Sequence, residues 1–482
     1  MRSIAPWSCL FVMACSPAPA PIAPWTPPTD DFVRSDRTHL VDQAGRVMVF
    51  RGVNVRVEGV FDVSLDRTRC PPPTDVLEPI PPLTDDDLGR MREIGFDVIR
   101  LPIQWSAIEP MEGSFDEAYL SRVEDVVQRA AAHDLRVLID FHADGWSKDL
   151  GEDGAPLWAT RPIPTALLCG PLGDTLATRR ANTLTNYSTF FDDTQAESVT
   201  LQNAYGSMLA HVAARFADDP SVIGYDLVNE PLPSDAPIQR FYARILPALR
   251  GVDTRHLAFF EPSAIRNFSD MGPRSIAPFP DVSGVYAVHL YTLSFSDPMN
   301  QLDTIMRARL EPNVMRAATE AAAFQAPLFA GEWGIRPDSP GSAPYVGIMY
   351  DLFDERAASS TVWVWKESAQ GAWGLFDFDP TTGAFTERPS VIAPHTRVWA
   401  EVIAGEPVDA SYDAATHAFE LTYVGRNDTA PSVIRVPAAI LPTFRASCDG
   451  APLASATRDA RTGRVEVVCP GAGTHVVRIE PA

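Results

Sequence analysis

Eight short apolar runs separated by amphipathic stretches constrain the fold of this 482-residue chain more than any other feature of its sequence. Short apolar runs are typical of buried strands, and stretches with apolar residues three and four positions apart are typical of helices. Their alternation predicts an α/β fold in which eight parallel strands close into a (β/α)₈ or TIM barrel. We expect strands at 47–55, 97–103, 136–142, 222–230, 256–261, 285–291, 327–333 and 361–366, and helices at 85–94, 119–133, 204–217, 237–249, 304–324 and 346–356.

The chain is longer than one barrel requires, because such a barrel uses about 250 residues. After Gly405 the pattern changes to short alternating runs without a helical stretch, which predicts a small C-terminal antiparallel β-sandwich domain. We therefore expect a signal peptide over 1–15, a tether rich in proline and alanine over 16–37, the barrel over 38–405 and the sandwich over 406–482.

The N-terminus has the features of a targeting segment. An apolar run follows Arg2, and Val12-Met13-Ala14-Cys15 resembles the processing site of bacterial lipoproteins, at which Cys15 would be lipidated. The run is too short to span a bilayer. We expect an exported protein that is either secreted or anchored at the cell surface as a bacterial lipoprotein. An ordinary signal peptide and a wrongly assigned start are the alternatives.

The charge balance excludes several classes of partner. The net charge is -22, with 62 acidic and 40 basic residues and no basic cluster. Such a chain repels nucleic acid phosphates and anionic membrane surfaces, so we expect no nucleic acid partner. Membrane contact is expected only through a lipid anchor or a substrate that itself lies in a membrane. We expect a monomer.

Four cysteines lie beyond the leader, and three pairings of them are possible. Proximity in the sequence favours Cys448–Cys469, which leaves Cys70 and Cys169 in two long segments, 57–82 and 143–200, that follow predicted strands. Free buried thiols remain the alternative. The cysteines form no CxxC motif or cluster with histidine, so we expect no metal site.

Polar side chains gather at the predicted carboxyl ends of the strands, where the active sites of such barrels lie. Two of them, Glu230 and Glu332, end very apolar strands, and a buried carboxylate in such a place needs partners. Two facing carboxylates are the groups that hydrolyse a glycosidic bond, one donating a proton and the other attacking the anomeric carbon. The other polar residues at strand ends are Asn54, Arg100, His142, Asn229, Glu261, His289, Tyr291, Trp365 and Lys366.

Five motifs follow one another along about residues 40 to 405. They are Gly95-Phe96-Asp97-Val98-Ile99-Arg100-Leu101-Pro102 with Trp105, Leu138-Ile139-Asp140-Phe141-His142, Asn229-Glu230-Pro231, His289-Leu290-Tyr291 and Gly331-Glu332-Trp333. These motifs and their order resemble those of glycoside hydrolase family 5. The resemblance implies a retaining enzyme with Glu230 as acid/base and Glu332 as nucleophile, and a reaction that needs no cofactor. It also implies a supporting shell of Arg100, His142, Asn229, His289, Tyr291 and Trp365.

Further points of similarity are Gly154-Ala155-Pro156-Leu157-Trp158, Asp144, Arg388-Pro389 and the C-terminal β domain. Within that family they resemble endoglycosylceramidases (endoglycoceramidases), which release the glycan from a glycosphingolipid. The resemblance implies that Asp144 and Trp158 lie near the outer sugar. The chain departs from that subgroup at Ala143, where glutamine is common, and after Asn54, where Val55-Arg56-Val57-Glu58 replaces small polar residues and a lysine.

Two other functions remain open at this point. An endo-β-1,4-glucanase acting on a polysaccharide would use the same pair of carboxylates in a longer cleft. A non-catalytic carbohydrate-binding surface protein would keep the barrel but need neither carboxylate. We expect the C-terminal domain to support the barrel by packing against it.

Overall fold

The computed structural model describes residues 22–164, 169, 176–232, 234–269, 271–273, 276–291, 294, 307–339, 341–368 and 373–482. The predicted signal peptide, Cys15 and the tether up to residue 21 lie outside the described residues. Among the described residues, no helix combines the length and apolar character needed to cross a membrane.

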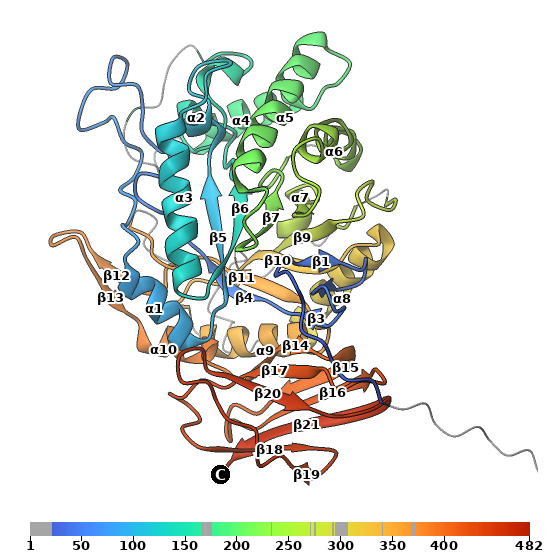
Figure 1. Ribbon diagram of the computed structural model, residues 1–482. Coiled ribbons are helices and arrows are strands. Elements are labelled where there is room, and N and C mark those ends of the chain that lie inside the picture. The colour runs from blue at the N-terminus through green and yellow to red at the C-terminus, as the bar shows by residue number, and fades with distance from the viewer. Residues whose placement is uncertain are drawn as a thin grey trace, which may run out of the picture.

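Eight parallel strands close into a barrel, which confirms the predicted fold class (Figure 1). Neighbouring strands follow one another around the barrel, and β11 pairs with β4 to close it. The strands are β4 (Arg51–Asn54), β5 (Val98–Ile103), β6 (Arg136–Phe141), β7 (Val222–Asp226), β8 (Leu257–Phe260), β9 (Gly284–Leu290), β10 (Leu328–Trp333) and β11 (Ser359–Val362).

Helices cover the outside of the barrel close to the six predicted segments. Thr84 caps the first of them, because its hydroxyl accepts a hydrogen bond from the backbone N–H of Asp87. The Asp87 carboxylate in turn accepts one from the backbone N–H of Thr84. The long helices are α1 (Asp85–Ile94), α3 (Glu117–Ala132), α4 (Leu176–Phe190), α5 (Ala196–Phe216), α6 (Asp235–Arg250), α8 (Arg307–Phe324) and α9 (Ser342–Asp354), and the short ones are α2 (Trp105–Ile108), α7 (Ile265–Ser269) and α10 (Pro389–Ile392).

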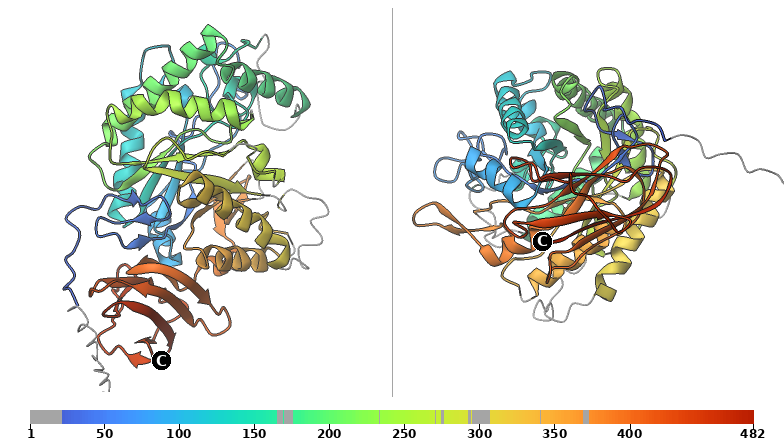
Figure 2. Two further views of the ribbon diagram at one scale, coloured as in Figure 1. Left: turned by 90° about the vertical axis from the view of Figure 1, so that its right-hand side faces the viewer. Right: turned by 60° about the horizontal axis from the view of Figure 1, so that its bottom comes forward.

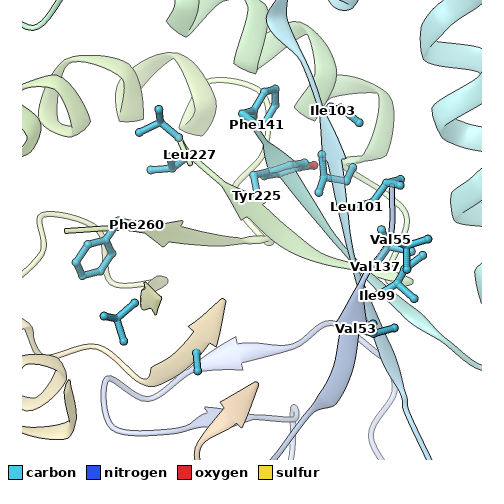
Figure 3. Close-up of a cluster of buried hydrophobic side chains, with 14 of the residues drawn as sticks. Val53, Val55, Ile99, Leu101, Ile103, Val137, Phe141, Tyr225, Leu227 and Phe260 are labelled. Atoms are coloured by element: carbon cyan, nitrogen blue, oxygen red, sulfur yellow. The ribbon is translucent and has the colours of Figure 1, made fainter. Parts of the chain in front are cut away.

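The barrel strands bury apolar side chains on both faces, which explains why they appear in the sequence as continuous apolar runs. One set fills the inside of the barrel, including Val98, Leu138 and Phe259. The other set lies between strands and helices, and Figure 3 shows it along β4 to β7 at Val53, Ile99, Leu101, Ile103, Val137, Phe141, Tyr225 and Leu227.

Two antiparallel sheets form a sandwich at the amino-terminal end of the barrel strands (Figures 1 and 2). A shared apolar core lies between them, including Trp399, Leu421, Ile434 and Val477. One sheet has the order β1 (Arg34–Ser35), β2 (Leu40–Val41), β3 (Val47–Met48), β14 (Trp399–Ile403), β17 (Pro431–Arg435) and β20 (Arg464–Val468). The other has the order β15 (Gly405–Tyr412), β16 (Phe419–Gly425), β21 (Gly473–Pro481), β18 (Phe444–Cys448) and β19 (Ala451–Pro452).

Strands from both ends of the predicted barrel segment, 38–405, therefore belong to the sandwich. β2 and β3 precede the first barrel strand, and β14 follows the last one. The predicted tether is also in contact with the sandwich, because Ala23 and Trp25 donate backbone hydrogen bonds to Asn427 and Thr429, each at 3.0 Å.

Two predicted segments are wrong in detail. The single strand expected over 47–55 is two strands, β3 in the sandwich and β4 in the barrel. All residues of the two strands except the partly buried Met48 are buried, so no exposed residue marks where the chain passes from one sheet to the other. The long connection expected over 143–200 contains α4 and the start of α5, whose polar composition conceals their helical periodicity. A hairpin of β12 (Phe376–Asp379) and β13 (Ala384–Glu387) was not predicted.

Candidate active site

Glu230 and Glu332 meet at the carboxyl-terminal mouth of the barrel. Glu332 lies within β10, and Glu230 lies in the segment that follows β7. His289 of β9 stands between them, and one of its ring nitrogens and one oxygen of each carboxylate all lie within 4.8 Å of one another. Retaining glycosidases place their two carboxyl groups about 5–5.5 Å apart, whereas inverting enzymes need roughly 6.5–9.5 Å to admit a water molecule. The arrangement is therefore that of a retaining site.

Glu332 is held by two donors and is almost fully buried, with 6% of its side chain exposed. Arg100 donates from Nη1 to Oε1 at 2.6 Å, and the Tyr291 hydroxyl donates to Oε2 at 2.9 Å. A charge-assisted hydrogen bond from a buried guanidinium is among the strongest that a carboxylate receives. These contacts fix the position of the Glu332 carboxylate, as a nucleophile requires.

Arg100 connects Glu332 to a buried set of polar groups beneath the mouth of the barrel. Its guanidinium contacts the carboxylates of Asp140 and Asp226 at 3.0 Å and that of Glu261 at 3.2 Å. It also donates to the side-chain oxygens of Asn54 and Asn229 at 3.0 and 2.9 Å. Burial by itself lowers the pKa of Arg100, but these carboxylates raise it well above its usual value.

Glu230 has the environment of a carboxyl group that keeps its proton. Burial raises the pKa of Glu230, and the negative charge of Glu332 acts in the same direction, although His289 opposes both effects. His289 Nδ1 lies 2.8 Å from Glu230 Oε1, and Asn267 donates to the same oxygen at 3.2 Å. The side chain is 17% exposed, so it remains accessible to a substrate. An acid/base residue needs this combination of a raised pKa and an open face.

Glu261 directly follows β8 and lies below both glutamates. One of its oxygens accepts the backbone N–H of Glu230 at 3.0 Å, and the other lies 3.1 Å from His289 Nε2. Burial raises the pKa of Glu261 to about 8, with Asp226 acting in the same direction and His289 and Arg100 opposing. The pKa of His289 is in turn raised well above its usual value: burial lowers it, and Glu261 and Glu332 more than compensate.

His142 and Asp144 form a second group beside Glu230. His142 Nδ1 lies 2.6 Å from Asp140, and its Nε2 lies 3.5 Å from Asp144, which accepts a hydrogen bond from Asn229 at 3.0 Å. One potential ligand atom each of His142, Asp144 and Asp153 lies within 4.8 Å of the other two. Burial lowers the pKa of His142, but Asp140 and Asp144 raise it well above its usual value.

Trp365 does not lie where the family resemblance led us to expect it. It is 1% exposed, donates its indole N–H to Asp87 at 3.1 Å and packs on Phe376, so it cannot contact a substrate. The prediction failed because β11 ends at Val362, three residues before Trp365. Trp158 is partly exposed, donates to the backbone of Glu109 at 2.9 Å and packs against Trp105, and its place near an outer sugar stays a prediction.

Trp363, rather than Trp365, lies at the site, and the sequence analysis missed it. Its ring stacks on that of His142 with centroids 5.7 Å apart and an angle of 7° between the planes. It is only partly buried, so one apolar face can contact a sugar ring. Asn267 was also missed, because it lies in α7 beyond any predicted strand. To choose Trp363 over Trp365 from the sequence, the last residue of the eighth strand would have had to be known.

Both favoured disulfides are present. Cys70 and Cys169 are joined with their Cα atoms 5.4 Å apart, and this bond links the segments that follow β4 and β6. Cys448 and Cys469 are joined within the sandwich, with Cα atoms 5.9 Å apart.

Comparison with known proteins agrees with this geometry. The family model described as Cellulase (glycosyl hydrolase family 5) matches residues 73–369, which include Glu230 and Glu332.

The chain belongs to glycosyl hydrolase family 5.

Among curated family relatives, endoglycoceramidase I of Rhodococcus hoagii is 32% identical over 210 residues, which is 44% of this chain and 38% of that protein. The alignment thus spans little more than a third of that relative. Endoglycoceramidase of Cyanea nozakii is 23% identical over 453 residues, covering 81% of each protein. The solved structure of endo-glycoceramidase II from Rhodococcus sp. in a ganglioside GM3 complex is 25% identical, with a TM-score of 0.74 over 92% of this chain and 99% of that one.

Proposed function

We propose that this protein is an endoglycoceramidase-like enzyme that hydrolyses the β-glycosidic bond between the glycan and the ceramide of a glycosphingolipid, with retention of configuration. The observation that carries the retaining mechanism is the approach of the Glu230 and Glu332 carboxylates, each within 4.8 Å of the other. The choice of a glycolipid is supported by the endoglycoceramidases among the relatives and by the GM3 complex of a similar structure.

The reaction proceeds in two steps. In the first, the Glu332 carboxylate attacks the anomeric carbon while Glu230 gives its proton to the glycosidic oxygen, so that the ceramide leaves as an alcohol. A covalent glycosyl-enzyme ester remains on Glu332. In the second step Glu230, now ionised, takes a proton from a water molecule while the water oxygen attacks the same carbon. This releases the glycan and restores both residues.

The surrounding residues support these roles. Arg100 and Tyr291 hold Glu332 from two sides, which fixes its attacking oxygen. Asn229 is adjacent to Glu230, where a side-chain amide can contact a sugar hydroxyl as charge develops on the ring. Asp144 has 44% of its side chain exposed and can therefore accept a hydrogen bond from an outer sugar.

We also infer that the protein is exported. Two disulfides support this, because such bonds persist mainly in oxidising compartments. The lipoprotein-like processing site at Cys15 supports anchoring at the cell surface. A single chain supplies all the groups of the site, which is consistent with a monomer.

Product analysis on a panel of substrates tests the proposed function. The full chain is incubated with glucosylceramide, lactosylceramide and ganglioside GM3, and in parallel with cellotetraose and carboxymethylcellulose, and the products are identified by mass spectrometry. We expect free ceramide together with the intact glycan from at least one glycolipid, and no product from the Glu332→Gln variant. Turnover of the glucans alone would instead support an endo-β-1,4-glucanase, the activity that the family description favours.

A further inference from the structure

We propose that Glu261 is a positioning residue that holds the backbone of the acid/base residue and orients the histidine beside it. The proposal rests on the proposed function, since it assigns Glu261 a part in the proton transfer by Glu230. Glu261 lies outside the five family motifs, although it is 1% exposed and directly follows a barrel strand.

Three donors contact the Glu261 carboxylate. Oε2 accepts the backbone N–H of Glu230 at 3.0 Å. Oε1 lies 3.2 Å from Arg100 Nη2 and 3.1 Å from His289 Nε2. Its two oxygens thus face three donors, so the side chain acts as an acceptor in each of these contacts. Tyr242 fixes the backbone of the residue by donating to its carbonyl at 2.9 Å and accepting from its N–H at 3.0 Å.

The contact with the Glu230 backbone has a specific reason. Glu230 has a φ of +42°, in the left-handed region that residues other than glycine seldom adopt. A residue persists in that conformation only where its surroundings hold it there, and such residues concentrate at functional sites. Glu261 supplies that restraint, because it holds the backbone N–H of Glu230. The position of this N–H sets the direction of the acid/base side chain.

The contact with His289 fixes the orientation of that ring. Both nitrogens of a protonated imidazole are donors, and each is held by the acceptor that it faces. Glu261 Oε1 lies 3.1 Å from Nε2 and holds that side of the ring, and this turns Nδ1 toward Glu230 Oε1 at 2.8 Å. Glu261 thus acts at both ends of Glu230, on its backbone directly and on its carboxyl group through His289.

The surroundings of Glu261 contain other charges, but none replaces it in these contacts. The charged and titratable groups that face it are Arg100 from β5, Asp226 and Glu230 from β7 and the segment after it, His289 from β9 and Tyr242 from α6. Asp226 is within 4.8 Å of both Glu261 and His289. Its Oδ2 is engaged by Arg100 at 3.1 Å, and no contact joins it to the Glu230 backbone.

The Glu261→Gln variant tests the proposal. Glutamine has the same shape but only one acceptor oxygen, so in either orientation its NH₂ group faces a donor. The measured quantity is kcat/KM, which reports the first irreversible step, for two aryl β-glycosides (lactosides or cellobiosides, whichever the wild-type enzyme hydrolyses). One has a 2,4-dinitrophenyl leaving group that needs no acid, and the other has a phenyl group that does.

We expect kcat/KM for the phenyl glycoside to fall at least tenfold in Glu261→Gln, with kcat reduced more than KM is changed. We expect kcat/KM for the dinitrophenyl glycoside to fall less than threefold. Equal losses on the two substrates would show a merely structural role and overturn the proposal, as would wild-type values on both. Failure of the wild-type enzyme to hydrolyse any β-glycoside would instead contradict the proposed function.

Two further variants guard against a folding defect. Tyr242→Phe removes only the hydroxyl that holds the Glu261 backbone, and we expect the same selective loss on the phenyl glycoside, at least threefold. Glu401→Gln is the matched control, because Glu401 is a buried glutamate paired with Arg435 at 2.7 Å in the sandwich, at the opposite end of the barrel. We expect it to leave the ratio of the two kcat/KM values unchanged. An unselective loss in Tyr242→Phe would overturn the proposal even if Glu261→Gln does not fold.

Discussion

Arg100 occupies the centre of the site at the scale of single residues. Its side chain is fully buried and contacts four carboxylates, and of these only Glu332 is placed to attack a sugar. A buried ion pair is costly to break, because the remaining charge loses its partner without regaining water. The guanidinium therefore fixes the nucleophile while Asp140, Asp226 and Glu261 keep the guanidinium itself in place.

Removing the second donor to Glu332 should slow the reaction without unfolding the protein. Tyr291→Phe deletes a hydroxyl that donates to Glu332 at 2.9 Å. A hydrogen bond to a charged group contributes about 1.5–3 kcal/mol, so we expect kcat to fall by about 10- to 100-fold. The check is kcat on an aryl β-glycoside together with the thermal unfolding temperature.

Tyr225→Phe is the matched control for that variant. The Tyr225 hydroxyl also donates to a buried carboxylate, that of Asp253 at 2.9 Å, but outside the site. We expect a loss of stability in Tyr225→Phe with kcat unchanged. Equal kcat values for Tyr291→Phe and the wild type would show that the hydroxyl does not act on Glu332.

The pH dependence should reveal the proton on Glu230. The acid works only while protonated, so kcat/KM falls as the pH rises through the pKa of Glu230. Burial raises that pKa and the His289 cation lowers it. In His289→Gln the cation is gone, so we expect the alkaline limb of kcat/KM for a phenyl glycoside to move to higher pH. A limb that stays in place or moves to lower pH would contradict the assignment.

At the scale of elements, the sequence revealed those parts of the site that lie on strands. Arg100, His142, His289, Tyr291 and Glu332 lie in or directly after strands with strong apolar patterns, and the structure brings them together. Trp363 could not be separated from Trp365, because the apolar residues around the end of β11 continue past the strand and conceal where it stops. Asn267 and the α4 helix lie in segments whose form depends on tertiary contacts rather than on a sequence pattern.

The bond between Cys70 and Cys169 should restrain two loops beside the site. The bond closes a sequence separation of 99 residues, for which chain entropy gives about 4–5 kcal/mol. In the Cys70→Ser/Cys169→Ser double variant we expect a protease to cut within 57–82 or 143–164, where the wild type resists. Mass spectrometry of the fragments identifies the sites. Cys448→Ser/Cys469→Ser, which opens the bond in the sandwich, should leave these segments intact, and identical fragments from all three proteins would contradict the prediction.

At the scale of the whole molecule, strands from both ends of the barrel segment join the barrel to the sandwich. β14 joins the end of the barrel segment to β17, while β2 and β3 join its beginning to the same sheet. Sequence analysis placed a boundary near Gly405, because the helical pattern stops there. It could not show that strands before the barrel pair with strands after it, since such pairing leaves no local mark in the sequence.

Deleting residues 406–482 should therefore abolish folding rather than weaken substrate binding alone. The deletion removes β17 and β20, exposes the edge of β14 and leaves core residues such as Trp399 and Val398 without their partners. We expect the truncated chain to be insoluble or to lack a cooperative thermal transition in calorimetry. A soluble truncated protein with the kcat of the full chain would contradict this expectation.

The covalent intermediate offers the most direct test of the central claim, that Glu230 and Glu332 act on opposite sides of one glycosidic bond. The full chain is treated with a 2-deoxy-2-fluoro β-glycoside carrying a dinitrophenyl leaving group, digested and examined by mass spectrometry. We predict one added fluorosugar on the peptide that contains Glu332, present in Glu230→Gln and absent in Glu332→Gln. A label on another residue, or an active enzyme that acquires no label and yields the inverted anomer, would contradict it.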